Sequence, residues 1–112
     1  MISKDDVLQV FEKFKIDSKY FKEFNLKVLE YFIQELSVII EKFDDKETSE
    51  NLEELRCFFL EFEEGASEEE QEPENFLDGP VITLFLSIGD DTDKVELKTL
   101  LHNAKIILKI YS

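Results

Sequence analysis

Apolar residues recur at steps of three and four from the start of the chain, which is the spacing of one face of an α-helix. In residues 3–16 this repeat consists of Val7, Val10, Phe11 and Phe14. Ser3 precedes the run and Asp6 follows three residues later, a pair typical of a helix N-terminus. We therefore expect a first, short helix that stops near Ile16.

The longest periodic stretch covers residues 18–43. Its main repeat consists of Phe21, Phe24, Val28, Phe32, Leu36, Ile39 and Phe43. Other apolar side chains widen the surface beyond one face: Tyr20, Leu29, Tyr31, Ile33, Val38 and Ile40. Asp17 or Ser18 can cap its start. We expect the longest helix here, in the centre of the fold with neighbours on more than one side.

A polar turn at residues 44–49 precedes a third apolar repeat. We expect Thr48 or Ser49 to cap this helix and Gly65 to terminate it, because glycine tolerates a left-handed backbone. The inward positions are Leu52, Leu55, Phe58, Phe59 and Phe62. The outward positions are Glu53, Glu54, Glu61, Glu63 and Glu64.

A polar, glutamate-rich segment at residues 66–78 follows, and its composition predicts a mobile loop. Residues 80–88 fit either a helix or a strand by spacing. Pro80 at a first-turn position and Gly89 beyond the end favour a short buried helix.

The last periodic segment predicts a helix to the C-terminus, with its start near Asp91, Thr92 and Asp93. Its stripe consists of Leu97, Leu100, Leu101, Ala104, Ile107, Leu108 and Tyr111. The chain has 112 residues, the usual size of one domain. The pattern therefore predicts one all-α domain over residues 1–112, a small antiparallel bundle of four to five helices with an acidic loop near 66–78.

Charge is concentrated in the middle of the chain. The formal net charge is −14, and residues 44–78 hold fifteen acids against Lys46 and Arg56, a net −13. Such a charge repels nucleic acids and anionic membranes and favours a protein partner with a basic surface. The single cysteine, the lack of a signal-like start and the lack of ~20 consecutive apolar residues predict a cytoplasmic protein without a membrane span.

Catalytic and metal-binding patterns are weak. His102 lies among lysines on the last helix, where we expect a surface histidine. Cys57 precedes two phenylalanines, and we expect a buried or half-buried inert thiol. The acidic runs lack the spacing of a calcium loop, and three glycines cannot build a phosphate-binding loop. We therefore expect no catalytic residues, no metal, no cofactor and no enzyme.

The acids of the third helix and the following segment are close enough in sequence to form one negative surface. Its residues are Glu53, Glu54, Glu61, Glu63, Glu64, Glu68, Glu69, Glu70, Glu72, Glu74 and Asp78. One interpretation is a solvated face that serves solubility. The other is a docking surface for a basic protein partner.

The functional hypothesis is an acidic helical interaction module. It would act as an inhibitor, such as an immunity protein, antitoxin or nucleic-acid mimic, by occupying a basic surface on a nuclease. The alternative is a helical scaffold or adaptor that assembles through apolar helix surfaces, and a homodimer is compatible with either.

Overall fold

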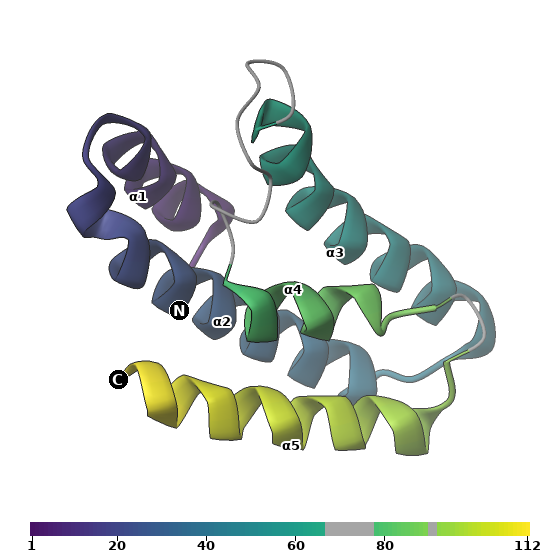
Figure 1. Cartoon of the computed structure of the whole chain (residues 1–112). Coiled ribbons are helices and arrows are strands. Elements are labelled where there is room, and N and C mark those ends of the chain that lie inside the picture. Colours follow the sequence, from purple (N-terminus) through teal and green to yellow (C-terminus); the bar gives the residue numbers. More distant parts are fainter. Residues whose placement is uncertain (67–77, 90–91) are drawn as a thin grey trace.

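In the residues that it describes, the computed structural model consists of helices and one short 3₁₀ turn (Figure 1). It describes residues 1–66, 78–89 and 92–112, with only the backbone described for residues 45, 61 and 63–66. The elements are α1 (Lys4–Ile16), the 3₁₀ turn η1 (Ser18–Tyr20), α2 (Phe21–Glu41), α3 (Asp45–Ala66), α4 (Gly79–Leu86) and α5 (Lys94–Tyr111). No strand occurs in this part of the chain, so the predicted all-α bundle is confirmed.

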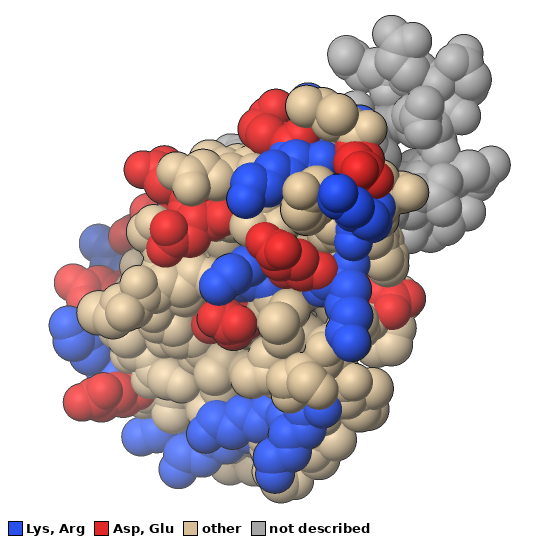
Figure 2. All heavy atoms as spheres, turned by 90° about the vertical axis from the view of Figure 1, so that its left-hand side faces the viewer, with Lys and Arg blue, Asp and Glu red and all other residues tan. Residues whose placement is uncertain are grey.

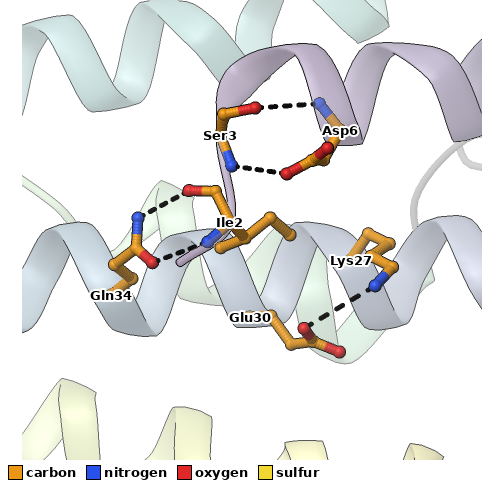
Figure 3. A network of polar contacts seen from close by, with 6 residues as sticks. All are labelled: Ile2, Ser3, Asp6, Lys27, Glu30 and Gln34. Atoms are coloured by element: carbon orange, nitrogen blue, oxygen red, sulfur yellow. Dashed lines mark hydrogen bonds and ion pairs between the residues drawn. The ribbon is translucent and has the colours of Figure 1, made fainter.

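The N-terminus is fixed by two sets of hydrogen bonds (Figure 3). The Ser3 amide donates to the Asp6 carboxylate (2.9 Å) and the Asp6 amide donates to the Ser3 hydroxyl (3.2 Å), which is the predicted capping pair. The bond from Ser3 also lowers the pKa of Asp6. The Gln34 side chain of α2 accepts from the Ile2 amide (2.9 Å) and donates to the Ile2 carbonyl (2.7 Å). These contacts tie the start of α1 to the middle of α2.

Helix α2 is central, as predicted, because it contacts α1, α3, α4 and α5. In Figure 1, α5 runs along the lower edge of the molecule and α1 and α3 lie above. The expectation that this helix is the longest is wrong: residues 18–20 form the 3₁₀ turn, so α2 has 21 residues and α3 has 22. The turn follows Asp17, whose carboxylate accepts from the Lys19 amide (3.0 Å) and thereby stabilises a separate short turn.

Helix α3 begins earlier and ends later than the sequence predicted. Asp44 supplies the N-terminal acceptor, with its carboxylate bonded to the Lys46 amide (3.0 Å). Thr48 is buried inside the first turn and accepts from the Asp44 amide (2.7 Å), so it supports the start of the helix without preceding it. The helix includes Gly65 and ends at Ala66, because a glycine is tolerated within a helix as well as after one.

The segment predicted at residues 80–88 is helical rather than extended, as favoured, but the helix ends at Leu86, two residues earlier than expected. Helix α4 starts after Asp78, whose carboxylate accepts from the Gly79 amide (2.9 Å), and Pro80 occupies its first turn. Helix α5 starts after Asp93, which accepts from the Glu96 amide (2.8 Å). The expected loop at 66–78 falls almost wholly outside the described residues, with Ala66 ending α3 and Asp78 preceding α4.

Phenylalanines from several helices form the core. Phe62 of α3 packs edge-on against Phe11 of α1 (ring centroids 4.8 Å apart) and Phe24 of α2 (5.2 Å). Phe59 of α3 stacks on Phe85 of α4 (5.3 Å). All five side chains predicted to point inward from α3 are buried: Leu52, Leu55, Phe58, Phe59 and Phe62. Burial of this aromatic side therefore fixes which side of α3 faces solvent.

Candidate protein-interaction surface

The outer side of α3 presents carboxylates to solvent. Glu50, Glu53 and Glu54 are all exposed, and Glu47 is exposed one turn closer to the helix start. Because the opposite side of the helix is held by buried aromatic rings, these carboxylates have a fixed backbone support. We define the α3 acidic face as Glu47, Glu50, Glu53 and Glu54.

No described lysine or arginine forms an ion pair with the α3 acidic face. Among the residues that the structure describes, the ion pairs are Lys15–Glu12, Lys19–Asp17 and Lys27–Glu30, and all lie on α1, η1, α2 or the residue between α1 and η1. None of them includes an acid of α3. The carboxylates of the α3 acidic face therefore remain open to a partner's cationic groups.

Cys57 lies one turn after Glu53, beside the α3 acidic face, and is exposed, so the expectation of a buried or half-buried thiol is wrong. Its Sγ lies 3.6 Å from a Glu53 carboxylate oxygen, as a weak hydrogen-bond donor. The reason is geometric: each residue of an α-helix turns the side-chain direction by about 100°. Cys57 therefore points away from its neighbour Phe58, toward the outer side.

The other acids predicted to bind a partner have three different placements. Glu61, Glu63 and Glu64 belong to α3, but their side chains are outside the described atoms. Glu68, Glu69, Glu70, Glu72 and Glu74 lie outside the described residues. Asp78 is partly buried and makes internal bonds: its amide donates to Asn25 (2.8 Å), and its carboxylate accepts from Gly79 and from the Tyr111 hydroxyl. Asp78 is therefore occupied within the fold.

A groove of about 260 Å³ borders the α3 acidic face on the side of α2. Its polar lining is Lys4, Tyr31, Glu35, Asn51 and Glu54. Its apolar lining is Val38, Ile39 and Leu55. Because Glu54 belongs to both features, the negative surface of α3 continues into a hollow that also has Glu35 from the neighbouring helix.

Tyr31 is a neutral hydrogen-bonding group in this groove. Burial raises its pKa to about 12, and the charges of Glu35 and Glu54 act in the same direction. The ring itself packs on Phe58 at 4.9 Å between centroids. The groove therefore combines two carboxylates, the Asn51 amide and a protonated phenol with one ammonium group, that of Lys4. The carboxylates outnumber the ammonium group, so the groove suits one further guanidinium or ammonium group.

Sequence reasoning missed Glu35. The signal was weak: Tyr31 and Glu35 are one helical turn apart on α2, but nothing in the sequence shows which part of α3 packs beside them. The groove depends on the packing of two helices, and periodicity within each helix does not specify it.

Comparison with protein-family models, with curated proteins and with solved structures found no match. The assignment of a function therefore rests on this chain's own surface.

Other candidate chemistry is sparse in the described part of the chain. No group of three or more His, Cys, Asp or Glu side chains is placed there to hold a metal ion. His102 is exposed on α5, as predicted. Over the same residues, no helix combines the length and apolar character needed to cross a bilayer.

Proposed function

We propose that this protein is an interaction module that binds a basic surface of a protein partner through the α3 acidic face and the adjoining groove. The observation that carries the proposal is the groove itself. Glu35 and Glu54 line the same hollow as Lys4, and no ion pair between described residues includes either carboxylate. A basic side chain entering it would meet two carboxylates from two different helices.

Arginine suits this groove better than lysine. Its planar guanidinium can donate to both carboxylates at once and can stack on an aromatic ring, whereas a lysine ammonium acts as a single compact charge. Tyr31 remains protonated, so its hydroxyl adds no negative charge and can donate to an oxygen of the partner. The row of carboxylates along α3 would contact further basic residues at the rim.

The partner class that fits this chemistry is a protein whose own ligand is an anion. A row of carboxylates on a rigid helix can occupy a groove that otherwise binds phosphates, so a nuclease inhibited by an immunity protein, antitoxin or nucleic-acid mimic is the specific form of the proposal. A cytoplasmic site of action is part of the same proposal, supported by the use of a single cysteine.

The test compares two variants of equal charge. The α3 variant combines Glu53→Lys and Glu54→Lys and changes the α3 acidic face. The control variant combines Glu12→Lys and Glu23→Lys, which make the same charge change at exposed positions of α1 and α2. Each is used, beside the wild type, to capture proteins from a lysate of the source cell, and the captured proteins are quantified by mass spectrometry. We expect the α3 variant to lose a partner that the control variant retains.

Equal capture by both variants in low salt would contradict the proposal, because net charge alone would then account for binding. Suppose that the wild type and the control variant capture a partner in low salt and lose it in moderate salt. This result supports the proposal, since surface electrostatic interactions are screened beyond about 8 Å at physiological ionic strength. Circular dichroism of all three proteins is the control that checks whether the fold is unchanged.

A further inference from the structure

Helix α5 carries two adjacent rows of exposed side chains that its packing does not use. The first row is basic and consists of Lys94, Lys98, His102, Lys105 and Lys109. The second is apolar: Val95, Ile106 and Ile110 are 72%, 47% and 74% exposed. Steps of three and four residues keep each row on one side of a helix. We call the two rows together the Lys–Ile face.

The fold does not require this face. Helix α5 packs on α2 and α4 through its other side, where Leu97, Leu100 and Ala104 are buried. Exposed isoleucines contribute nothing to that burial, and isolated exposed apolar residues are ordinary. Here, however, Ile106 and Ile110 lie one turn apart on the same side of α5 as Val95, with the exposed Thr99 and Asn103 between them, and next to this side runs a line of positive charge.

The charge of this face is opposite to that of the chain as a whole. The net charge is −14, yet α5 contains four lysines and only one acid, Glu96. Figure 2 shows lysines gathered along the bottom of the molecule, over α5, without acidic residues among them. No ion pair between described residues includes a lysine of this helix.

A hollow of about 320 Å³ lies at the N-terminal end of the apolar row. Its lining includes Val95, Thr99 and Leu100 of α5 and Ser87 just beyond α4. The rest of its lining is polar and consists of Thr92, Glu96 and Asn103, so a side chain projecting from a bound helix would meet Val95 and Leu100 between polar groups. The Lys–Ile face therefore has this hollow in addition to its exposed side chains.

We propose that the Lys–Ile face is a docking surface for an amphipathic helix of a partner protein, with an apolar seam and an acidic flank. The apolar row has Val95 near the start of α5 and Ile106 and Ile110 in its last turns, so apolar side chains of a second helix packed alongside would contact it at both ends. The lysine row then lies beside the partner's flank, where carboxylates would pair with it, as flanking charges do in coiled coils. The inference does not rest on the α3 acidic face.

A second copy of the chain fits this face poorly. Two copies of α5 packed antiparallel about a two-fold axis would place both lysine rows on the same side of the seam, where they repel each other. A parallel pair would place four lysines opposite a flank whose only acid is Glu96. An anionic membrane also fits poorly, because lysines border only one side of the apolar row and the remainder of the molecule is strongly negative.

The probe is a synthetic helical peptide with leucines at its seam positions and glutamates along one flank, labelled for fluorescence anisotropy. A peptide with lysines in place of the glutamates and a scrambled peptide of the same composition serve as ligand controls. We expect the glutamate peptide to bind saturably and the two controls to bind at least about tenfold more weakly, because charge complementarity selects the partner.

Two variants test the two rows separately. The lysine variant combines Lys98→Glu, Lys105→Glu and Lys109→Glu, and the isoleucine variant combines Ile106→Ser and Ile110→Ser. Each variant should weaken binding of the glutamate peptide by about tenfold or more. The matched charge control is Lys13→Glu with Lys22→Glu and Lys42→Glu, three exposed lysines outside α5. The α3 variant Glu53→Lys with Glu54→Lys should bind the peptide as the wild type does, which separates this inference from the proposed function.

Three outcomes would overturn the inference. The first is equal binding of the glutamate and scrambled peptides, or no binding below about 1 mM. The second is self-association of the wild type, seen by sedimentation and absent from the variant with Ile106→Ser and Ile110→Ser. This result would assign the face to a homodimer. The third is that the wild type binds phosphatidylserine vesicles but not the glutamate peptide, and that the lysine variant no longer binds the vesicles. This result would assign the face to a membrane.

Discussion

The hydroxyl of Tyr111, in the last turn of α5, donates a hydrogen bond to the carboxylate of Asp78, the residue that caps α4. The Asp78 amide in turn donates to the side chain of Asn25, a fully buried residue of α2 whose amide group donates to the Phe21 carbonyl (2.9 Å). One carboxylate and one amide thus connect three helices at the point where the chain enters α4.

Removal of this contact should destabilise the fold measurably. Tyr111→Phe deletes the hydroxyl and should lower the free energy of unfolding by about 1.5–3 kcal/mol, the usual range for a hydrogen bond to a charged group. Asp78→Ala deletes the same bond together with the helix cap and should cost somewhat more. Urea denaturation of both single variants and the double variant measures the coupling, and strictly additive losses would show that the bond contributes nothing.

The tyrosines should make stability decline at alkaline pH. Burial and the bond to Asp78 raise the pKa of Tyr111, and burial raises that of Tyr31 to about 12. Unfolded tyrosine ionises near pH 10, so above this pH the unfolded chain loses protons that the folded chain keeps. The stabilisation is complete below about pH 10 and is lost as pH rises through the folded pKa values.

Absorbance at the phenolate wavelength gives the measurement for this second prediction. The folded protein should titrate two tyrosines at distinctly higher pH than the urea-unfolded chain, and Tyr31→Phe should remove one of them. Titration of Tyr31 and Tyr111 at the same pH in the folded and unfolded states would refute the assigned burial.

Substitutions on the two sides of α3 should separate stability from surface charge. Phe59 is 1% exposed and stacks on Phe85, so Phe59→Ala should lower the free energy of unfolding by about 3–5 kcal/mol through the cavity that it leaves. Glu54→Lys on the exposed side should change it by less than about 0.5 kcal/mol. Thermal melting followed by circular dichroism distinguishes them, and similar losses for both would mean that the outer side of α3 is also packed.

Cys57 offers a direct probe of the α3 acidic face. Because the thiol is exposed, it should react with a maleimide in the native protein at a rate within about tenfold of that in urea, slowed mainly by its acidic neighbours. A bulky maleimide should then block partner capture while the helical signal stays unchanged. Cys57→Ser treated with the same reagent is the control, and capture that survives complete labelling would place the binding site elsewhere.

The helices themselves could be predicted because each has its own apolar repeat. Phe11, Phe24, Phe59 and Phe62 were all expected to point inward, and all are buried. The start of α3 could not be predicted in the same way, because a threonine can bond to the helix start from before it or from within its first turn. Thr48 does the latter, and the helix consequently begins three residues before it.

The surfaces were harder to predict than the core. The acids of α3 were expected to be outward, and Glu53 and Glu54 are exposed. The groove required Glu35 from α2, and the exposed row on α5 required Ile106 and Ile110 to fall beyond the packed side of that helix. Both features depend on the rotation of each helix about its own axis relative to its neighbours. A repeat of apolar residues does not determine this rotation to better than the width of several side chains.

The carboxylates of α3 and the lysines of α5 lie on different helices with α2 and α4 packed between them (Figure 1). This separation gives the described part of the chain a permanent electric dipole in addition to the net charge of the protein. A dipole experiences a torque in the field of any charged surface, and the torque acts before contact is made. The protein would therefore rotate as it approaches, with α3 turned toward a positive surface and α5 toward a negative one, so that two partners of opposite charge could be held on opposite sides without competing.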